Sequence, residues 1–153
     1  MSESSGQAST QPPLPARLLM DTHVLLWLVE GYGILGNKSR VVIDASASQS
    51  SLYLSAITPW EIGLLVSKGR IRLCADVMQW INETLAKPGV RLAPLTPEIA
   101  VASTRLPFEM HPDPADRILV ATARHLGATL VTADKALLEL AKQGYFAAMD
   151  AEG

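Results

Sequence analysis

Hydrophobic positions along the chain fall into short continuous runs, separated by longer stretches with helical spacing. The short runs predict strands at Arg17–Met20, Leu52–Leu54, Val90–Leu95, Thr129–Val131 and, at an edge, Tyr145–Met149. The stretches between them predict helices at about Thr22–Glu30, Lys38–Ala47, Thr58–Lys68, Ala75–Ala86, Thr96–Thr104, Pro114–Leu126 and Lys135–Lys142. Such regular alternation indicates an α/β fold, in which helices cover a central, mainly parallel sheet of four or five strands.

The first 16 residues, MSESSGQASTQPPLPA, lack this periodicity. They are rich in Ser, Gln and Pro, so we expect a flexible tail over residues 1–16 and a single domain over residues 17–153. The tail has neither the basic nor the apolar region of a signal peptide. Asp21 and His23 interrupt the longest apolar run well short of the ~20 residues that span a bilayer, so we expect no membrane segment.

Composition adds constraints on the compartment and the ligands. The 153 residues are 48% hydrophobic with a mean hydropathy of +0.20, enough to bury a core without disulfides. The single cysteine, Cys74, excludes an intrachain disulfide and a thiolate metal cluster, and it fits a reducing cytoplasm. The net charge of −2 gives no overall basic surface for nucleic acid, although bound divalent cations can supply positive charge locally.

Four acidic residues follow predicted strands or begin the helices after them. They are Asp21, Glu61, Asp116 and Asp134. Because parallel strands end at the same edge of a sheet, these carboxylates can converge there. Two carboxylates about 4 Å apart repel by roughly 4 kcal/mol at an effective dielectric near 20, so a cluster needs protons or a cation. Oxygen ligands without cysteine and with few histidines select Mg²⁺ or Mn²⁺ rather than Zn²⁺.

Each acid also has a purely structural explanation. Asp21 and Asp134 fit helix N-caps. The segment Thr58-Pro59-Trp60-Glu61 fits a capping box, and Asp113-Pro114-Ala115-Asp116 repeats the pattern with Asp in place of Glu. For any one acid alone, capping is the simpler interpretation. Only the convergence of all four predicts a metal site.

Several neighbouring side chains are candidates for supporting roles. Ser55 and Thr58 offer hydroxyls close to the second acid, and Thr132 lies beside the fourth. Asp113 lies on nearly the same helical face as the third acid, as an auxiliary ligand. Its capping role, together with an ion pair to Arg117 four residues later, is the favoured interpretation.

The histidines and tryptophans carry less specific signals. We expect His23 to be a hydrogen-bonded structural residue, while contact with a phosphate is the less favoured role for His111. Trp27, Trp60 and Trp80 are expected in the core or between helices rather than as platforms for base stacking.

These motifs resemble the PIN-domain family, and within it the VapC-type toxins of bacterial toxin–antitoxin pairs. The resemblance rests on LLMDTHVLLWLVEG, then LSAITPWEIGLLVSKGRIRL, then LTPEIAVASTRLPFEMHPDPADRILVATARHLGATLVTADKALL, in that order, and it covers about Arg17 to Met149. It implies one PIN domain with a three-layer α/β/α sandwich and the activity of a Mg²⁺- or Mn²⁺-dependent endoribonuclease.

The resemblance also implies a set of site residues and partners. It places the family's four catalytic acids on Asp21, Glu61, Asp116 and Asp134, so no catalytic position is missing. The family's hydroxyl near the second acid is best matched by Thr58, with Ser55 as the alternative. The implied partners are an RNA substrate, a second copy of the chain in a homodimer, and a small VapB-like antitoxin that obstructs the acidic site.

Three other functions remain open from the sequence. A PIN nuclease of RNA maturation or DNA processing would use the same acids without toxicity. A haloacid-dehalogenase-like phosphatase would use Asp21 as its nucleophile, but that chemistry normally needs a second Asp two residues later, where this chain has His23. A non-catalytic interaction module would use the acids as helix caps only.

Overall fold

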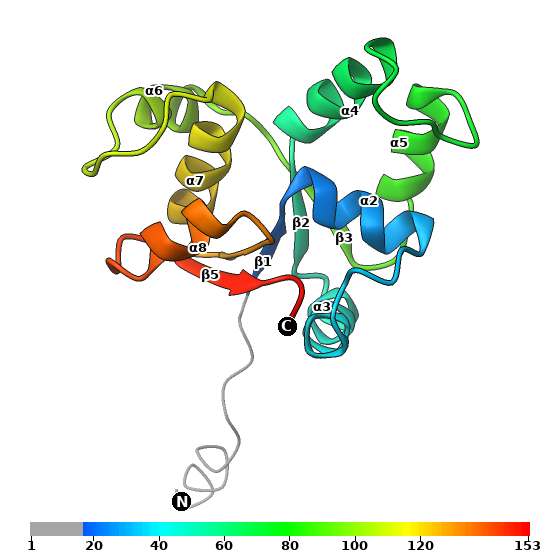
Figure 1. The fold of residues 1–153 in the computed structure, drawn as a ribbon, viewed down its shortest axis with the longest axis horizontal. Coiled ribbons are helices and arrows are strands. Elements are labelled where there is room, and N and C mark those ends of the chain that lie inside the picture. The colour runs from blue at the N-terminus through cyan, green and yellow to red at the C-terminus, as the bar shows by residue number, and fades with distance from the viewer. Residues whose placement is uncertain (1–16) are drawn as a thin grey trace, which may run out of the picture.

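Five short strands form one fully parallel sheet in the computed structural model, which describes residues 17–153 (Figure 1). The strands are β1 (Leu18–Met20), β2 (Leu52–Ser55), β3 (Val90–Ala93), β4 (Thr129–Thr132) and β5 (Ala147–Asp150). Their order in the sheet is β3-β2-β1-β4-β5, so the predicted parallel sheet is confirmed with five strands. The expected tail over residues 1–16 lies outside the described residues.

Seven helices connect the strands within residues 17–153. They are α2 (Thr22–Glu30), α3 (Asn37–Ser48), α4 (Ile57–Ser67), α5 (Val77–Leu85), α6 (Pro97–Thr104), α7 (Pro114–Leu126) and α8 (Lys135–Ala141). The predicted bounds of α2 and α7 are confirmed to the residue. Gly127 ends α7 at φ 63°, a left-handed conformation that glycine adopts without a steric penalty. No helix in this part of the chain is long and apolar enough to cross a membrane.

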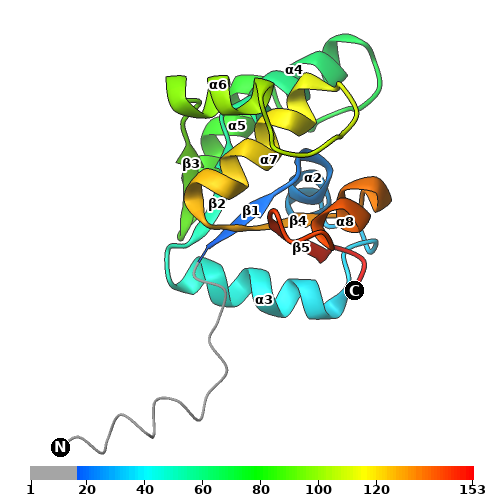
Figure 2. The same ribbon diagram turned by 90° about the vertical axis from the view of Figure 1, so that its left-hand side faces the viewer.

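The sheet separates two hydrophobic cores, because successive residues of a strand point to opposite faces. Leu18 and Met20 pack with α2, α3 and α5 on one face, and Leu19 packs with α7 and α8 on the other. All three side chains of β1 have no exposed surface, as expected for a central parallel strand. Figure 2 views the sheet from the α7 side. The three-layer α/β/α arrangement is therefore confirmed.

The strand order contains one reversal, and it positions the functional site. The chain runs outward from β1 through β2 to β3, then returns to place β4 on the opposite side of β1. Connections from neighbouring strands that diverge in this way leave a crevice at the carboxyl ends of those strands. Asp21 directly follows β1 and Asp134 follows β4 by two residues, so both lie at this crevice.

Candidate metal centre

A cavity of about 390 Å³ lies at the carboxyl ends of β1 and β4. All four predicted acids line it, together with a fifth carboxylate, and no Lys or Arg of the described chain does. The lining residues are Asp21, His23, Trp27, Glu61, Asp113, Asp116, Ala133 and Asp134. The structure thus brings together side chains that are up to 113 positions apart in the sequence, from Asp21 to Asp134.

Asp21 is held by hydrogen bonds to both of its carboxylate oxygens. As the N-cap of α2, it accepts a hydrogen bond from the backbone N–H of His23 at Oδ1, over 3.2 Å. The hydroxyl of Thr132, which is fully buried, donates to Oδ2 over 2.8 Å. The apolar residues on either side anchor β1 and α2, so the half-buried carboxylate is fixed at the rim of the sheet.

The Thr132 hydroxyl connects the first acid to the fourth. It accepts a hydrogen bond from the backbone N–H of Asp134 over 3.1 Å while donating to Asp21. Asp134 is the N-cap of α8, and its Oδ1 accepts from the amides of Ala136 and Leu137. The capping interpretation of both acids is correct. It is compatible with their convergence, because the two capped helices begin at the same cavity and both carboxylates line it.

Glu61 approaches from α4 and is held by a pair of buried threonines. Thr22 Oγ1 donates to Glu61 Oε1 over 2.5 Å and lies 3.1 Å from Thr58 Oγ1. Because Thr22 has a single hydroxyl proton, which goes to Glu61, Thr58 must donate to Thr22. A chain of hydrogen bonds therefore runs from Thr58 through Thr22 to the carboxylate.

The predicted capping box at the start of α4 is wrong. The helix begins at Ile57, one residue before Thr58, and its N-cap Ala56 has no side-chain oxygen to offer. Thr58 is thereby turned into the interior, with no exposed surface. Ser55 satisfies the backbone N–H of Ile57 over 3.1 Å, so this hydroxyl supports the helix start.

Asp116 projects from the first turn of α7, which Asp113 caps through its bond from the N–H of Ala115. His111 lies on the preceding loop, with Nε2 3.4 Å from Asp116 Oδ2. One donor atom from each of His111, Asp116 and Asp134 lies within 4.8 Å of the other two. From the sequence, contact with a phosphate was the less favoured role for His111, and the only signal for a place at the site was its position just before Asp113 and Asp116.

Arg117 does not pair with Asp113, contrary to expectation. Its guanidinium donates from Nε to the carbonyl oxygen of Ser103 over 2.9 Å and from Nη1 to that of Met110 over 3.4 Å. It therefore anchors the loop between α6 and α7. Within residues 17–153, no arginine pairs with the carboxylates of the cavity.

Burial and the neighbouring negative charges raise the pKa of two of the acids. Burial raises the pKa of Asp116 to about 7, with further contributions from the charges of Asp113 and Asp21, and His111 opposes the shift. Burial also raises the pKa of Glu61, which the hydrogen bond from Thr22 partly offsets. A divalent cation would relieve this repulsion, and the donor set of carboxylate oxygens fits a hard ion.

Two other side chains differ from expectation. The ring of His23 is exposed at the cavity and makes no hydrogen bond within the described chain, so the predicted structural role is wrong. Trp60 is 57% exposed on α4 rather than packed. The prediction for Trp80 is confirmed, since it is buried and donates from Nε1 to Glu30. Trp27 is partly buried against the first core and also lines the cavity.

The fold and the site together define an α/β protein with an acid-lined cavity at a reversal of strand order. The chain belongs to the PIN-domain family, whose model matches residues 18–143. It is 33% identical over 120 residues to Ribonuclease VapC22 of Mycobacterium tuberculosis (strain ATCC 25618 / H37Rv), a match that covers 78% of this chain and 88% of that protein. The resemblance stated from the motifs is confirmed.

Solved structures share the fold at lower sequence identity. VapBC2 from Rickettsia felis, bound to a DNA fragment from its promoter, matches with a TM-score of 0.62 at 13% identity, over 86% of this chain and 96% of that one. FitAcB from Neisseria gonorrhoeae matches with a TM-score of 0.57 at 24% identity, over 88% and 97%. A toxin–antitoxin complex from Klebsiella pneumoniae matches with a TM-score of 0.53 at 21% identity, over 78% and 89%.

Proposed function

We propose that this protein is a divalent-cation-dependent endoribonuclease and the toxin of a toxin–antitoxin pair. The observation that carries the proposal is the convergence of Asp21, Glu61, Asp116 and Asp134 in one cavity that no Lys or Arg of residues 17–153 lines. The 33% identity to a ribonuclease of the VapC type supports RNA as the substrate. Mg²⁺ or Mn²⁺ is the proposed ion, because the acids are hard oxygen donors.

The four acids would hold the ion, with Asp113 as an auxiliary carboxylate. When bound, such an ion lowers the pKa of a water molecule and offsets the charge that develops on a phosphodiester. The chain's own contribution is to fix the carboxylates before the ion and the RNA arrive. Thr132 and the helix amides orient Asp21 and Asp134, and the Thr58–Thr22 pair orients Glu61.

The same proposal includes the partners and the extent of the domain. Residues 17–153 act as a single PIN domain in a cytoplasmic homodimer, inhibited by a small VapB-like antitoxin. Induced expression should arrest bacterial growth, and co-expression of the product of the adjacent reading frame should relieve the arrest. Growth arrest is the observation that separates a toxin from a PIN nuclease of RNA maturation or DNA processing. Normal growth would contradict the toxin role.

Substitution of one helix cap inside the cavity and one outside it tests the catalytic assignment. Asp76 caps α5 as Asp21 caps α2, since its Oδ2 accepts from the N–H of Met78 over 3.0 Å. Asn caps helices about as well as Asp, so both Asp→Asn variants keep the cap and remove the charge. Cleavage of a labelled RNA in Mg²⁺ should fall about 10³-fold in Asp21→Asn, equivalent to about 4 kcal/mol of transition-state stabilisation.

The matched variant Asp76→Asn should keep cleavage within about twofold of the original protein. Circular dichroism and thermal melting establish that both variants fold. Calorimetric titration with Mn²⁺ should show binding to Asp76→Asn and about tenfold or weaker binding to Asp21→Asn. Equal cleavage and equal Mn²⁺ binding in the two variants would contradict the assignment and favour an interaction module whose acids serve only as caps.

A further inference from the structure

His111 is positioned to take part in the proposed metal site. It is carried by the loop before α7, whereas the two acids grouped with it, Asp116 and Asp134, come from α7 and from the N-cap of α8. Its Nε2 lies 3.4 Å from Asp116 Oδ2, and donor atoms of His111, Asp116 and Asp134 lie within 4.8 Å of one another. An imidazole nitrogen thus reaches the group of carboxylate oxygens that would surround an ion.

We propose that His111 is a direct ligand of the cation, which makes the site a mixed nitrogen–oxygen site. The proposal rests on the metal-dependent function proposed above. Two ligands of one ion, each with a bond of about 2.1 Å, lie at most about 4.2 Å apart. The separations in the structure are close to that limit, so a small movement of an exposed loop residue is sufficient for His111 to bind.

The position of His111 favours ligation over a simple ion pair. An exposed His–Asp contact of 3.4 Å contributes little by itself, because the His111 side chain is 38% exposed and the pair is screened by water. Pro112 and Pro114 restrict the backbone that joins His111 to α7. This restriction lowers the entropic cost of holding the imidazole ring of His111 near Asp116. His23, the histidine that lines the cavity itself, is absent from the group of three donor atoms, whereas His111 belongs to that group through Asp116 and Asp134.

A nitrogen ligand changes which ion the site selects. Mg²⁺ strongly prefers oxygen ligands, whereas imidazole suits first-row transition metals. We therefore expect His111 to raise the affinity for Mn²⁺ relative to Mg²⁺. Replacing His111 with Gln should weaken Mn²⁺ binding about tenfold and Mg²⁺ binding by no more than about threefold.

Pulsed electron paramagnetic resonance of the full chain with one equivalent of Mn²⁺ tests the ligand directly. A coordinated imidazole produces ¹⁴N modulation of the Mn²⁺ signal, and the chain has three histidines, so each can be tested by substitution. Modulation should be present in the original protein, retained in His23→Gln and His125→Gln, and lost in His111→Gln. A further variant, His111→Asp, should lose the modulation and keep Mn²⁺ affinity within a few-fold, because it restores a ligand. A residue that acts only as a positive partner of Asp116 would not be replaceable in this way.

The outcomes separate this proposal from the one on which it rests. Mn²⁺ binding that depends on Asp21 but shows no ¹⁴N modulation would overturn the role of His111 and leave the acidic site in place. Modulation that persists in His111→Gln and disappears in His23→Gln would also overturn it. Absence of Mn²⁺ binding to the original protein would overturn both proposals. If His111→Gln fails to fold, as judged by circular dichroism, His111→Asn provides the same test with a shorter side chain.

Discussion

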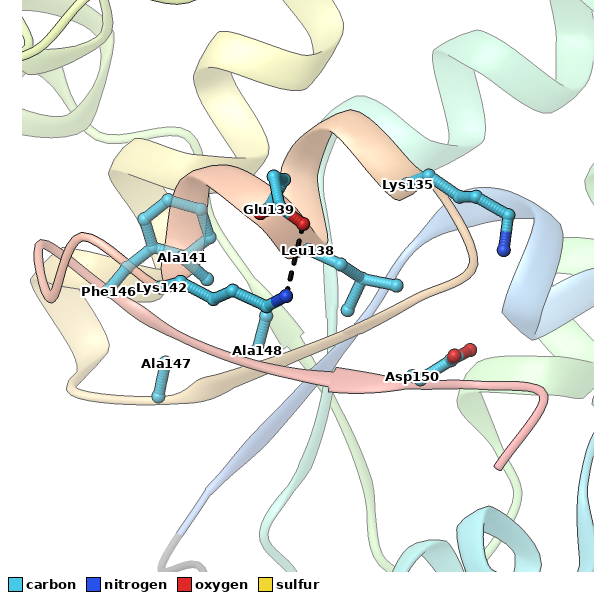
Figure 3. Close-up of a pocket in the computed structure, with 9 residues that line it drawn as sticks. All are labelled: Lys135, Leu138, Glu139, Ala141, Lys142, Phe146, Ala147, Ala148 and Asp150. Carbon is cyan, nitrogen blue, oxygen red and sulfur yellow. Dashed lines mark hydrogen bonds and ion pairs between the residues drawn. The ribbon is translucent and has the colours of Figure 1, made fainter.

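The acid cavity at the ends of β1 and β4 contrasts with a second depression, the α8–β5 hollow. That hollow is larger, about 620 Å³ against about 390 Å³. Figure 3 shows its lining, in which Lys142 pairs with Glu139 on α8, and Lys135 and Asp150 lie at the other end. The charged groups of the hollow carry both signs and are exposed. The charged groups of the acid cavity are carboxylates, of which Asp21, Glu61, Asp116 and Asp134 are half-buried.

The difference shows that volume alone does not identify a functional site. The carboxylate of Glu139 has a lysine 3.1 Å away and is 74% exposed, so nothing there requires a further ligand. Asp116 is 18% exposed among other acids, and this arrangement is unfavourable in the free protein. Clustered charge that is unfavourable in the absence of a ligand is therefore a better indicator of a functional site than the size of a hollow. The two regions can therefore be tested against each other.

The largest effect is expected from removing one carboxylate from each region. Asp116→Asn should reduce cleavage of a labelled RNA about 10³-fold in Mg²⁺, because it removes charge that would neutralise and hold the cation. Glu139→Gln should leave the rate within about twofold. Initial rates at saturating Mg²⁺, with melting curves for both variants, provide the measurement. A comparable loss of cleavage in Glu139→Gln would show that the α8–β5 hollow also contributes to the site.

The next effect is a loss of stability with rising pH in the cation-free protein. The pKa of Asp116 is raised to about 7 in the folded chain from 3.8, the value without the influence of the fold. Between these values the folded state holds a proton that the unfolded state has released. The free energy of unfolding should therefore fall as the pH rises from about 4 to about 7, by roughly 2 kcal/mol after allowance for partial exposure to water.

Urea denaturation in a chelating buffer at several pH values measures this loss. Asp116→Asn should flatten the profile, since it removes the group that titrates, and Mn²⁺ should also flatten it by favouring the ionised carboxylate. Glu139→Gln should leave the slope unchanged. A profile that rises with pH over this interval in the original protein would contradict the assignment of the raised pKa to Asp116.

Much of the fold was predictable because its signals are local. Helix α7 begins at Pro114, directly after its N-cap Asp113, and Gly127 caps its carboxyl end. Each of these residues marks a helix boundary by its own chemistry. Strand β1 is apolar at every position because both faces of it are covered. The convergence of the acids followed from the parallel topology and needed no side-chain detail.

The errors arose where tertiary contacts override a local pattern. Thr58 fits a capping box by sequence, but its hydroxyl binds that of Thr22, 36 positions away. Arg117 lies four residues after an acid, but its partners are two carbonyl oxygens, that of Ser103 near the end of α6 and that of Met110 on the following loop. The path of that loop has no periodicity that would reveal these contacts from the sequence. Trp60 is apolar yet exposed, since α4 packs only part of its surface. The contact of His111 with the acids depends on the same loop.

A smaller effect is expected from the hydroxyl that supports Glu61. Thr22→Val should lower the free energy of unfolding by about 1–2 kcal/mol, because it leaves Glu61 and Thr58 without their shared partner. Thr22→Ser should retain most of that stability. Chemical denaturation at pH 8 provides the measurement.

Thr122 offers a matched control for this substitution. It is as deeply buried as Thr22, but its hydroxyl donates to the carbonyl oxygen of Ile118 within α7, over 2.7 Å. That carbonyl also takes part in the helix, so Thr122→Val should cost less than about 0.5 kcal/mol. Equal costs for Thr22→Val and Thr122→Val would contradict a specific role for the Thr58–Thr22–Glu61 chain.

The smallest effect is expected in the α8–β5 hollow, where Lys142 and Glu139 are three positions apart and 73% and 74% exposed. Such a pair exchanges solvation for attraction at almost no net gain, and it also restricts two flexible side chains. A double-mutant cycle with Lys142→Gln and Glu139→Gln should give a coupling of about 0.3 kcal/mol, measured by urea denaturation at low salt. The coupling should disappear at about 1 M salt, where the screening length is roughly 3 Å. A coupling above about 1 kcal/mol that persists in salt would mean that the pair is protected from water. The α8–β5 hollow and the acid cavity would then differ in the signs of their charged groups and not in how far those groups are exposed to water.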